Sequence, residues 1–198
     1  MYDLKPEAKH FLQRLKEETS EAHASLEENE LSKRIVSSDL SSEEYAAYLS
    51  KMLPLHQALE ERVFPQLETV FPDLEARKKT HLIQADLKKL NTTATGNVSF
   101  SEDMSFTTTL AGALGMMYVI EGSALGGKVI LKQLHKSLPE EIYDGASNYF
   151  SVYGDKIGGM WMRFLQTFSD EVASKGLEND VIEGAKQSFS LVKNWFDK

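Results

Sequence analysis

The sequence predicts an all-α fold, a compact multi-helix bundle formed by one domain over residues 1–198. Three observations support this class. Apolar residues recur at helical spacing along most of the chain, capping signals precede several of these stretches, and no alternating pattern predicts a strand. A chain of 198 residues can also bury a core without disulfides, and this chain contains no cysteine.

The amino-terminal half contains the clearest helix signals. Ser41 and Glu44 have the spacing of a capping box, so a second helix begins there and runs toward Pro65, with a kink or break expected at Pro54. The first helix is expected to be long and amphipathic. Its apolar stripe has spacings of three, four and seven residues and consists of Leu4, Ala8, Phe11, Leu15, Ala22 and Leu26.

Prolines, glycines and polar segments predict where the remaining helices begin and end. A proline at the first helical position predicts a third helix over Pro72–Leu90, and the polar segment Asn91–Ser105 reads as a loop and the one candidate mobile region. A long, apolar, glycine-rich helix is expected over Phe106–Lys136. Shorter helices are expected over Pro139–Phe150, Tyr153–Lys175 and Glu178–Phe196.

The composition and net charge limit the classes of molecule that this protein is expected to bind. With 22 basic and 30 acidic residues the net charge is −8, which argues against a surface that binds nucleic acid. The amino-terminal segment is charged and lacks the pattern of a secretory signal, and the longest apolar run, Leu110–Ile120, is too short to span a bilayer. We therefore expect a cytoplasmic protein with no membrane partner, and the lack of cysteine is compatible with that compartment.

The segment EGSALGGK, residues 121–128, has three glycines within an otherwise apolar helix. Each glycine costs about 1 kcal/mol relative to alanine in a helix interior, so the missing side chains must serve a purpose. Gly122 and Gly126 lie four residues apart and share a helix face, and Gly127 is expected to widen this bare track. The track fits either close packing against another helix or a flat ligand lying on the main chain.

His23 is the candidate ligand among the five histidines. It lies at the border of the first helix's apolar stripe, and Glu27, four residues later, can hydrogen-bond the imidazole nitrogen that does not bind metal. Lys16 is two turns away, about 10 Å along the axis, where it could meet an anionic group. The alternative is an exposed histidine with an acidic neighbour. A di-iron site is disfavoured because only Glu7 and His10 have Glu-x-x-His spacing.

Three segments together resemble a known family. LKEETSEAHASLEE (Leu15–Glu28) and YVIEGSALGGKVILKQL (Tyr118–Leu134) are similar to the two helices that enclose haem in the haem oxygenases, bacterial members included. VIEGAKQSFSLVKNWF (Val181–Phe196) is similar to the closing helix of that family. Because these segments span nearly the whole chain in the family's order, the resemblance implies a haem-oxygenase-like bundle.

The resemblance also implies roles for individual residues. His23 is the implied proximal ligand of the haem iron and Glu27 its hydrogen-bonding partner, while Lys16 matches a base near a haem propionate. Arg163 is a further candidate for a propionate, from its position and charge alone. The remaining residues with implied roles are the distal-helix residues Gly122, Ser123, Gly126 and Gly127 and the pocket aromatic Phe189.

The implied activity is oxidative opening of the porphyrin ring to biliverdin, with release of iron and carbon monoxide. Haem is then both cofactor and substrate, molecular oxygen is the oxidant, and an external ferredoxin or reductase supplies electrons. Ser123 departs from many members, which have an aspartate at this position that organises distal water. Two alternatives remain: a non-catalytic haem carrier of the same fold, and a related helical-bundle enzyme acting on another small molecule, such as a thiamin-type pyrimidine.

Overall fold

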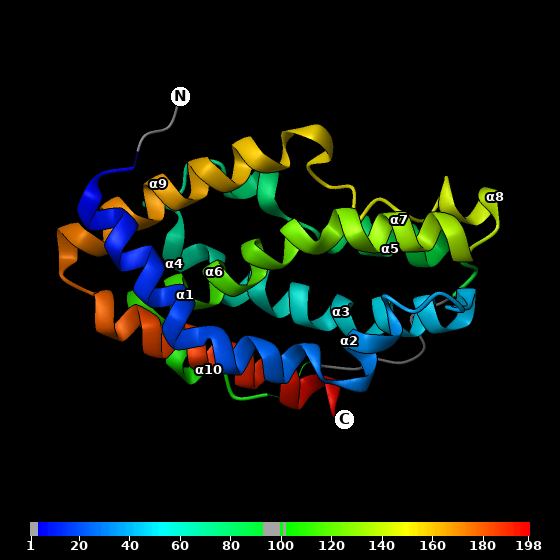
Figure 1. The fold of residues 1–198 in the computed structure, drawn as a ribbon, viewed down its shortest axis with the longest axis horizontal. Coiled ribbons are helices and arrows are strands. Elements are labelled where there is room, and N and C mark those ends of the chain that lie inside the picture. Colours follow the sequence, from blue (N-terminus) through cyan, green and yellow to red (C-terminus); the bar gives the residue numbers. More distant parts are fainter. Residues whose placement is uncertain (1–3, 93–99, 101) are drawn as a thin grey trace.

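The computed structural model describes residues 4–92, 100 and 102–198, and this part of the chain contains helices and no strand (Figure 1). The α-helices are α1 (Pro6–Glu27), α2 (Glu30–Arg34), α3 (Ser42–Arg62), α4 (Phe64–Leu67), α5 (Thr80–Lys89), α6 (Leu110–Ser123), α7 (Gly127–Ser137), α8 (Glu140–Tyr143), α9 (Ile157–Lys175) and α10 (Glu178–Phe196). Short 3₁₀ turns are η1 (Leu74–Arg77), η2 (Ser105–Thr108), η3 (Ala124–Gly126) and η4 (Gly154–Lys156). The expected all-α class is confirmed.

The capping box predicted for the second helix is present. Ser41 Oγ accepts a hydrogen bond from the Glu44 amide at 3.2 Å, and Glu44 Oε2 accepts one from the Ser41 amide at 2.9 Å. At Pro54 a kink or a break was expected, and the break does not occur, because α3 continues through this residue to Arg62. The kink stays a prediction. Pro54 and its neighbours are buried, and their packing offsets the roughly 3 kcal/mol that an interior proline costs.

The predicted third helix is shorter than expected. Only the turn η1 forms after Pro72, and α5 begins at Thr80, where the carboxylate of Glu60 accepts hydrogen bonds from the Lys79 and Thr80 amides at 2.7 and 2.8 Å. These amides have no partner within a helix that begins there, so the glutamate of a neighbouring helix caps it. The mobile loop expected over Asn91–Ser105 lies mostly outside the described residues.

The glycine-rich helix expected over Phe106–Lys136 is divided into three pieces. The turn η2 precedes α6, and the 3₁₀ turn η3 separates α6 from α7, so the chain changes its helical geometry within the glycine track. The prediction for Pro139–Phe150 was too long, since only the short α8 forms there, and α9 begins at Ile157 after η4. The last helix, α10, has the predicted bounds.

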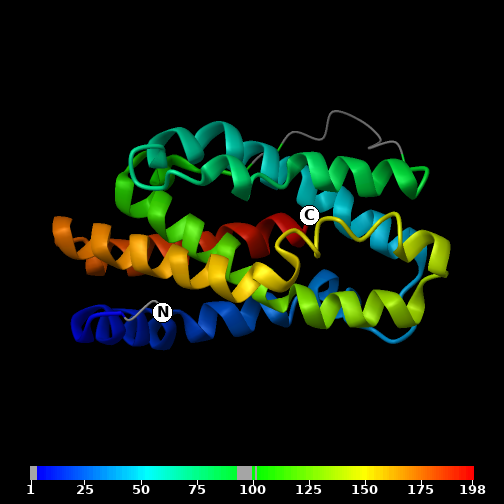
Figure 2. The same cartoon turned by 90° about the horizontal axis from the view of Figure 1, so that it is seen from above.

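Helix α6 lies at the centre of the bundle and packs directly against α10 (Figure 2). A Cβ atom added at Gly115 would lie 2.5 Å from the carbonyl carbon of Gly184, and one added at Gly184 would lie 2.9 Å from the Cα of Gly112. The two helices therefore touch through their main chains. Helix α1 packs on α10 as well and contacts α9, so α10 supports both α1 and α6.

The stretch Leu110–Ser137 is long and apolar enough to cross a membrane by length and composition alone. Core helices of soluble proteins pass the same test, and here α6 is the most buried helix segment of the bundle. The turn η3 also interrupts the stretch near its middle.

Candidate functional site: His23 and the glycine bend

His23 lies on the carboxyl-terminal half of α1 with one ring nitrogen open to a ligand. Its Nδ1 is 3.4 Å from Glu27 Oε2, and the edge of its ring packs on Phe189 of α10 with 5.5 Å between ring centroids. Nε2 makes no hydrogen bond or ion pair with a described residue. Since 56% of the side chain is exposed, Nε2 is available to a ligand that approaches from outside the helix.

Gly122 and Gly126 form the bare surface predicted for the distal side. A Cβ atom at Gly126 would have no heavy atom within 4 Å, and one at Gly122 would meet only Trp161 Cη2, at an ordinary contact distance of 3.7 Å. At about 100° per residue, Leu125 and Val129 share this face with the two glycines. Leu125 is 42% exposed and Val129 65% exposed, so the main chain at Gly126 is bordered by apolar side chains that are partly open to solvent.

Gly127 does not widen this track, in contrast to the expectation. It is buried, and a Cβ atom there would lie 2.8 Å from the carbonyl oxygen of Phe150. Both interpretations of the glycines therefore apply, at different positions: Gly127 permits close packing, whereas Gly122 and Gly126 leave open main chain. A haem-binding role for Gly127 would have to act through this packing.

The other predicted residues lie on α1, at the end of α6 and on α9. Ser123 is exposed, and its hydroxyl donates a hydrogen bond to the Ile120 carbonyl at 2.7 Å, within its own helix. Lys16 is exposed on α1, and Arg163 Nη1 lies 3.9 Å from Asp73 Oδ2. The propionate roles of Lys16 and Arg163 stay predictions.

Helix α10 relates the two halves of the site. Phe189 contacts His23, and five residues earlier Gly184 packs on α6, the helix that leads into Gly122. Helix α10 thus contacts both α1, which provides His23, and α6, which leads into Gly122.

Trp161 and a buried charge cluster are features that the sequence analysis missed. Trp161 of α9 faces Gly122 and stacks on Phe164, yet nothing in its local sequence distinguishes it from a core aromatic. Glu121, which precedes Gly122, is 3% exposed and bonds Arg77, Lys79 and the Tyr153 hydroxyl. Burial raises the pKa of Glu121, but the positive charges of Lys79 and Arg77 more than offset this effect, so its pKa lies below the usual value.

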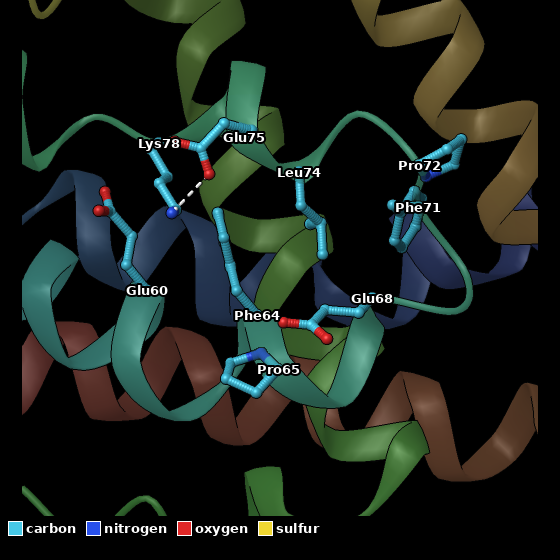
Figure 3. A pocket seen from close by; sticks show the side chains of 9 residues that line it. All are labelled: Glu60, Phe64, Pro65, Glu68, Phe71, Pro72, Leu74, Glu75 and Lys78. Carbon is cyan, nitrogen blue, oxygen red and sulfur yellow. Dashed lines mark ion pairs between the residues drawn. The ribbon is translucent and has the colours of Figure 1, made fainter.

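A separate groove of about 250 Å³ lies between α3, α4 and η1 and contains none of the predicted site residues (Figure 3). Its charged side chains are three glutamates and Lys78, which pairs with Glu75 at 2.6 Å. The groove is lined by Glu60, Phe64, Pro65, Glu68, Phe71, Pro72, Leu74, Glu75 and Lys78. We assign it no part in the site.

The arrangement of helices is that of a known class of haem-binding bundles. The haem oxygenase of Neisseria meningitidis, solved with NO and CO bound, superimposes with a TM-score of 0.73 at 23% identity, covering 94% of this chain and 92% of that one. The haem oxygenase of Leptospira interrogans gives 0.72 at 21% identity, covering 94% and 98%. Haem oxygenase-1 of Synechocystis, solved in complex with haem, gives 0.69 at 16% identity, covering 94% and 90%.

Sequence comparison then identifies the family. A profile of the family described as "Heme oxygenase" matches residues 9–198, and the chain belongs to this family. A haem oxygenase of Xanthomonas campestris pv. campestris is 38% identical over 80 residues. That alignment covers 40% of this chain and 47% of the relative, so the chain matches just under half of that protein's length.

Proposed function

We propose that the protein is a haem oxygenase that opens the haem ring to biliverdin and releases iron and carbon monoxide. The single observation that carries the proposal is that a member of this family has both an exposed His23, with Nδ1 beside Glu27, and open main chain at Gly126. A flat apolar macrocycle with a central metal fits these features. Its metal needs a nitrogen ligand on one side, and its face fits main chain bordered by Leu125 and Val129 on the other.

The residues present fit this group chemically. Glu27 lies beside Nδ1, so it can hold the imidazole in the tautomer that leaves Nε2 unprotonated, and it increases the basicity of the ligand. Phe189 supports the ring of His23 from the side and limits its rotation. When bound, haem supplies both the iron that activates dioxygen and the porphyrin that is oxidised, with electrons from an external ferredoxin or reductase.

On the distal side the protein contributes shape rather than charge. The absence of side chains at Gly122 and Gly126 allows the main chain to approach the ring face closely, and Trp161 closes one end of that surface. Main chain this close to a bound haem would leave only part of the ring face accessible. The edge of the ring that reacts is then selected by geometry.

A non-catalytic haem carrier is the second candidate, and the geometry of Ser123 favours it. The hydroxyl of Ser123 donates to its own helix, so in this conformation it offers no proton to a group at the distal face. The relatives described above are all haem oxygenases, so we do not pursue an enzyme acting on another small molecule. A carrier would leave bound haem intact after reductant and oxygen are added, whereas the enzyme would degrade it.

The test is an anaerobic haem titration followed by addition of a reductant and oxygen. The wild-type protein should bind haem with one proximal histidine, and the haem absorbance should then be replaced by that of a bilin. His23→Ala should lose the ligand, while His10→Ala, which alters an exposed histidine elsewhere on α1, should not. Persistent haem absorbance would favour the carrier, and lack of haem binding would refute both candidates.

A cytoplasmic location is part of the proposal. It is supported by the absence of cysteine from the sequence, and cell fractionation followed by immunodetection would test it.

A further inference from the structure

The cluster around Glu121 joins several segments of the chain to the end of α6. Lys79 Nζ donates to Glu121 Oε1 at 2.7 Å, the Tyr153 hydroxyl lies 3.0 and 2.9 Å from the two carboxylate oxygens, and Arg77 Nη1 donates to Oε2. Arg77 also binds Asp73 through two hydrogen bonds of 2.9 Å. The cluster therefore links η1, the first residue before α5, α6 and the segment that leads to α9.

Stability alone does not explain so many buried charges. The side chains of Arg77, Lys79 and Glu121 are 0%, 3% and 2% exposed. Burying ions requires their removal from water, and apolar residues of similar size often give equal or greater stability. Such a cluster instead fixes geometry, because each group has few positions in which all of its hydrogen bonds are satisfied.

The cluster is attached to the distal surface of the proposed haem site. Glu121 is the residue directly before Gly122, so fixing its side chain fixes the main chain at the start of the bare surface. The segment that provides Tyr153 also provides Phe150, whose carbonyl oxygen packs on Gly127 at the other end of η3. Residues 150–153 therefore contact the chain on both sides of the bend at Ala124–Gly126.

We propose that Glu121 is a positioning residue which, through Arg77, Lys79 and Tyr153, sets the place of the Gly122–Gly126 main chain over haem and thereby the ring edge that reacts. The inference rests on the proposed function and adds to it a determinant of product identity. Glu121 makes its contacts away from the open glycine face, so it acts through the main chain and not by touching haem.

The test compares three variants as full-length proteins loaded with haem. Glu121→Gln keeps the size of the side chain but removes the counter-charge of the buried Lys79 and one of the two carboxylates that pair with Arg77. Tyr153→Phe removes one hydroxyl and leaves both cations paired, so it tests the same cluster with less risk to folding. Val172→Ala is the matched control: Val172 is fully buried on α9 but lies eleven residues, about 16 Å, beyond Trp161.

The measurements are the resonance Raman and electron paramagnetic resonance spectra of the ferric haem complex, the haem Kd, and the ratio of bilin isomers by chromatography. We expect Glu121→Gln to alter the spectra, to raise the Kd about tenfold and to yield a second isomer as at least about a tenth of the product. Tyr153→Phe should change the same quantities in the same direction by less. Val172→Ala should lower the stability of the haem-free protein and leave all three unchanged.

The outcomes separate this inference from the proposed function. If the wild type binds no haem, the proposed function fails and the inference fails with it. If the wild type produces biliverdin but Tyr153→Phe, and Glu121→Gln where it folds, retain wild-type spectra and isomer ratio, the cluster is only structural and the inference is refuted. If Val172→Ala changes the isomer ratio as much as the cluster variants, general loosening of the fold explains the effect and the inference is again refuted.

Discussion

Alanine at position 126 separates the two explanations of the glycine track. Gly126 has φ −68° and ψ −17°, a conformation that alanine adopts freely, and a Cβ atom there would meet no atom within 4 Å. Gly126→Ala should therefore leave the free energy of unfolding of the haem-free protein unchanged or raise it by up to about 1 kcal/mol, because alanine is the better helix former.

The same methyl group should weaken haem binding. It would project from the face on which the ring is proposed to lie, and an overpacked contact costs about 1–3 kcal/mol. Because 1.4 kcal/mol is a factor of ten, the haem Kd should rise about tenfold or more. Gly126→Ala is thus expected to leave the stability of the haem-free protein unchanged or increased, while it lowers the affinity for haem.

Gly127→Ala is the matched comparison one residue away. Its Cβ atom would lie 2.8 Å from the Phe150 carbonyl oxygen, so the haem-free protein should lose about 1–3 kcal/mol, less the roughly 1 kcal/mol gained from helix propensity. Urea unfolding followed by circular dichroism gives the stabilities, and titration of the haem absorbance band gives the affinities. If Gly126→Ala binds haem as tightly as the wild type, the bare main chain does not face the ring and the proposed site is wrong.

Three further predictions concern single side chains. Burial and the positive charge of Lys79 hold the pKa of His56 well below 6.5, so below pH 6.5 the unfolded chain binds a proton that the folded chain does not. The free energy of unfolding should therefore fall as the pH is lowered below 6.5, by up to about 1.4 kcal/mol per pH unit. His56→Gln should remove this slope in urea titrations at pH 5–7. Lys16→Met should raise the haem Kd about three- to tenfold at low salt and by less at high salt, because a propionate contact at an exposed site is screened. Phe189→Leu should broaden the electron paramagnetic resonance signal of the ferric haem complex, since His23 loses the ring that supports it.

Each of these predictions has an outcome that contradicts it. An equally steep pH slope in His56→Gln would assign the slope to other groups. A salt-independent affinity change in Lys16→Met would argue for lost packing rather than lost charge. Sharp spectra in Phe189→Leu, with unchanged stability, would mean that Glu27 alone orients the imidazole.

Local signals in the sequence predicted much of the fold. The capping box at Ser41 and the apolar stripe of the first helix depend on residues within a few turns, so their spacing alone predicted α3 and α1. The start of α5 could not be predicted in this way. It depends on Glu60, twenty residues before Thr80, which caps the helix from a neighbouring element.

The site also combines features that local sequence spacing predicted with features that depend on distant segments. The pairing of His23 with Glu27 is an i,i+4 relation within one helix, and the sequence predicted it. The different environments of Gly126 and Gly127 depend on Phe150, which reaches Gly127 from a distant segment, so adjacent glycines could not be told apart. The partners of Glu121 come from residues 77, 79 and 153, so the buried charge cluster could be found only from the tertiary structure.

The contact between Gly115 and Gly184 has a consequence for the proposed haem site. Helix α10 provides Phe189, which contacts His23, and helix α6 leads into Gly122, so both parts of the proposed site belong to helices that touch through their main chains. A Cβ atom added at Gly115 or Gly184 would lie within 3.0 Å of main-chain atoms of the opposite helix, so a larger residue at either position would push the two helices apart. Substitution at this crossing is therefore expected to change the spacing of the proposed site without altering any residue proposed to contact haem.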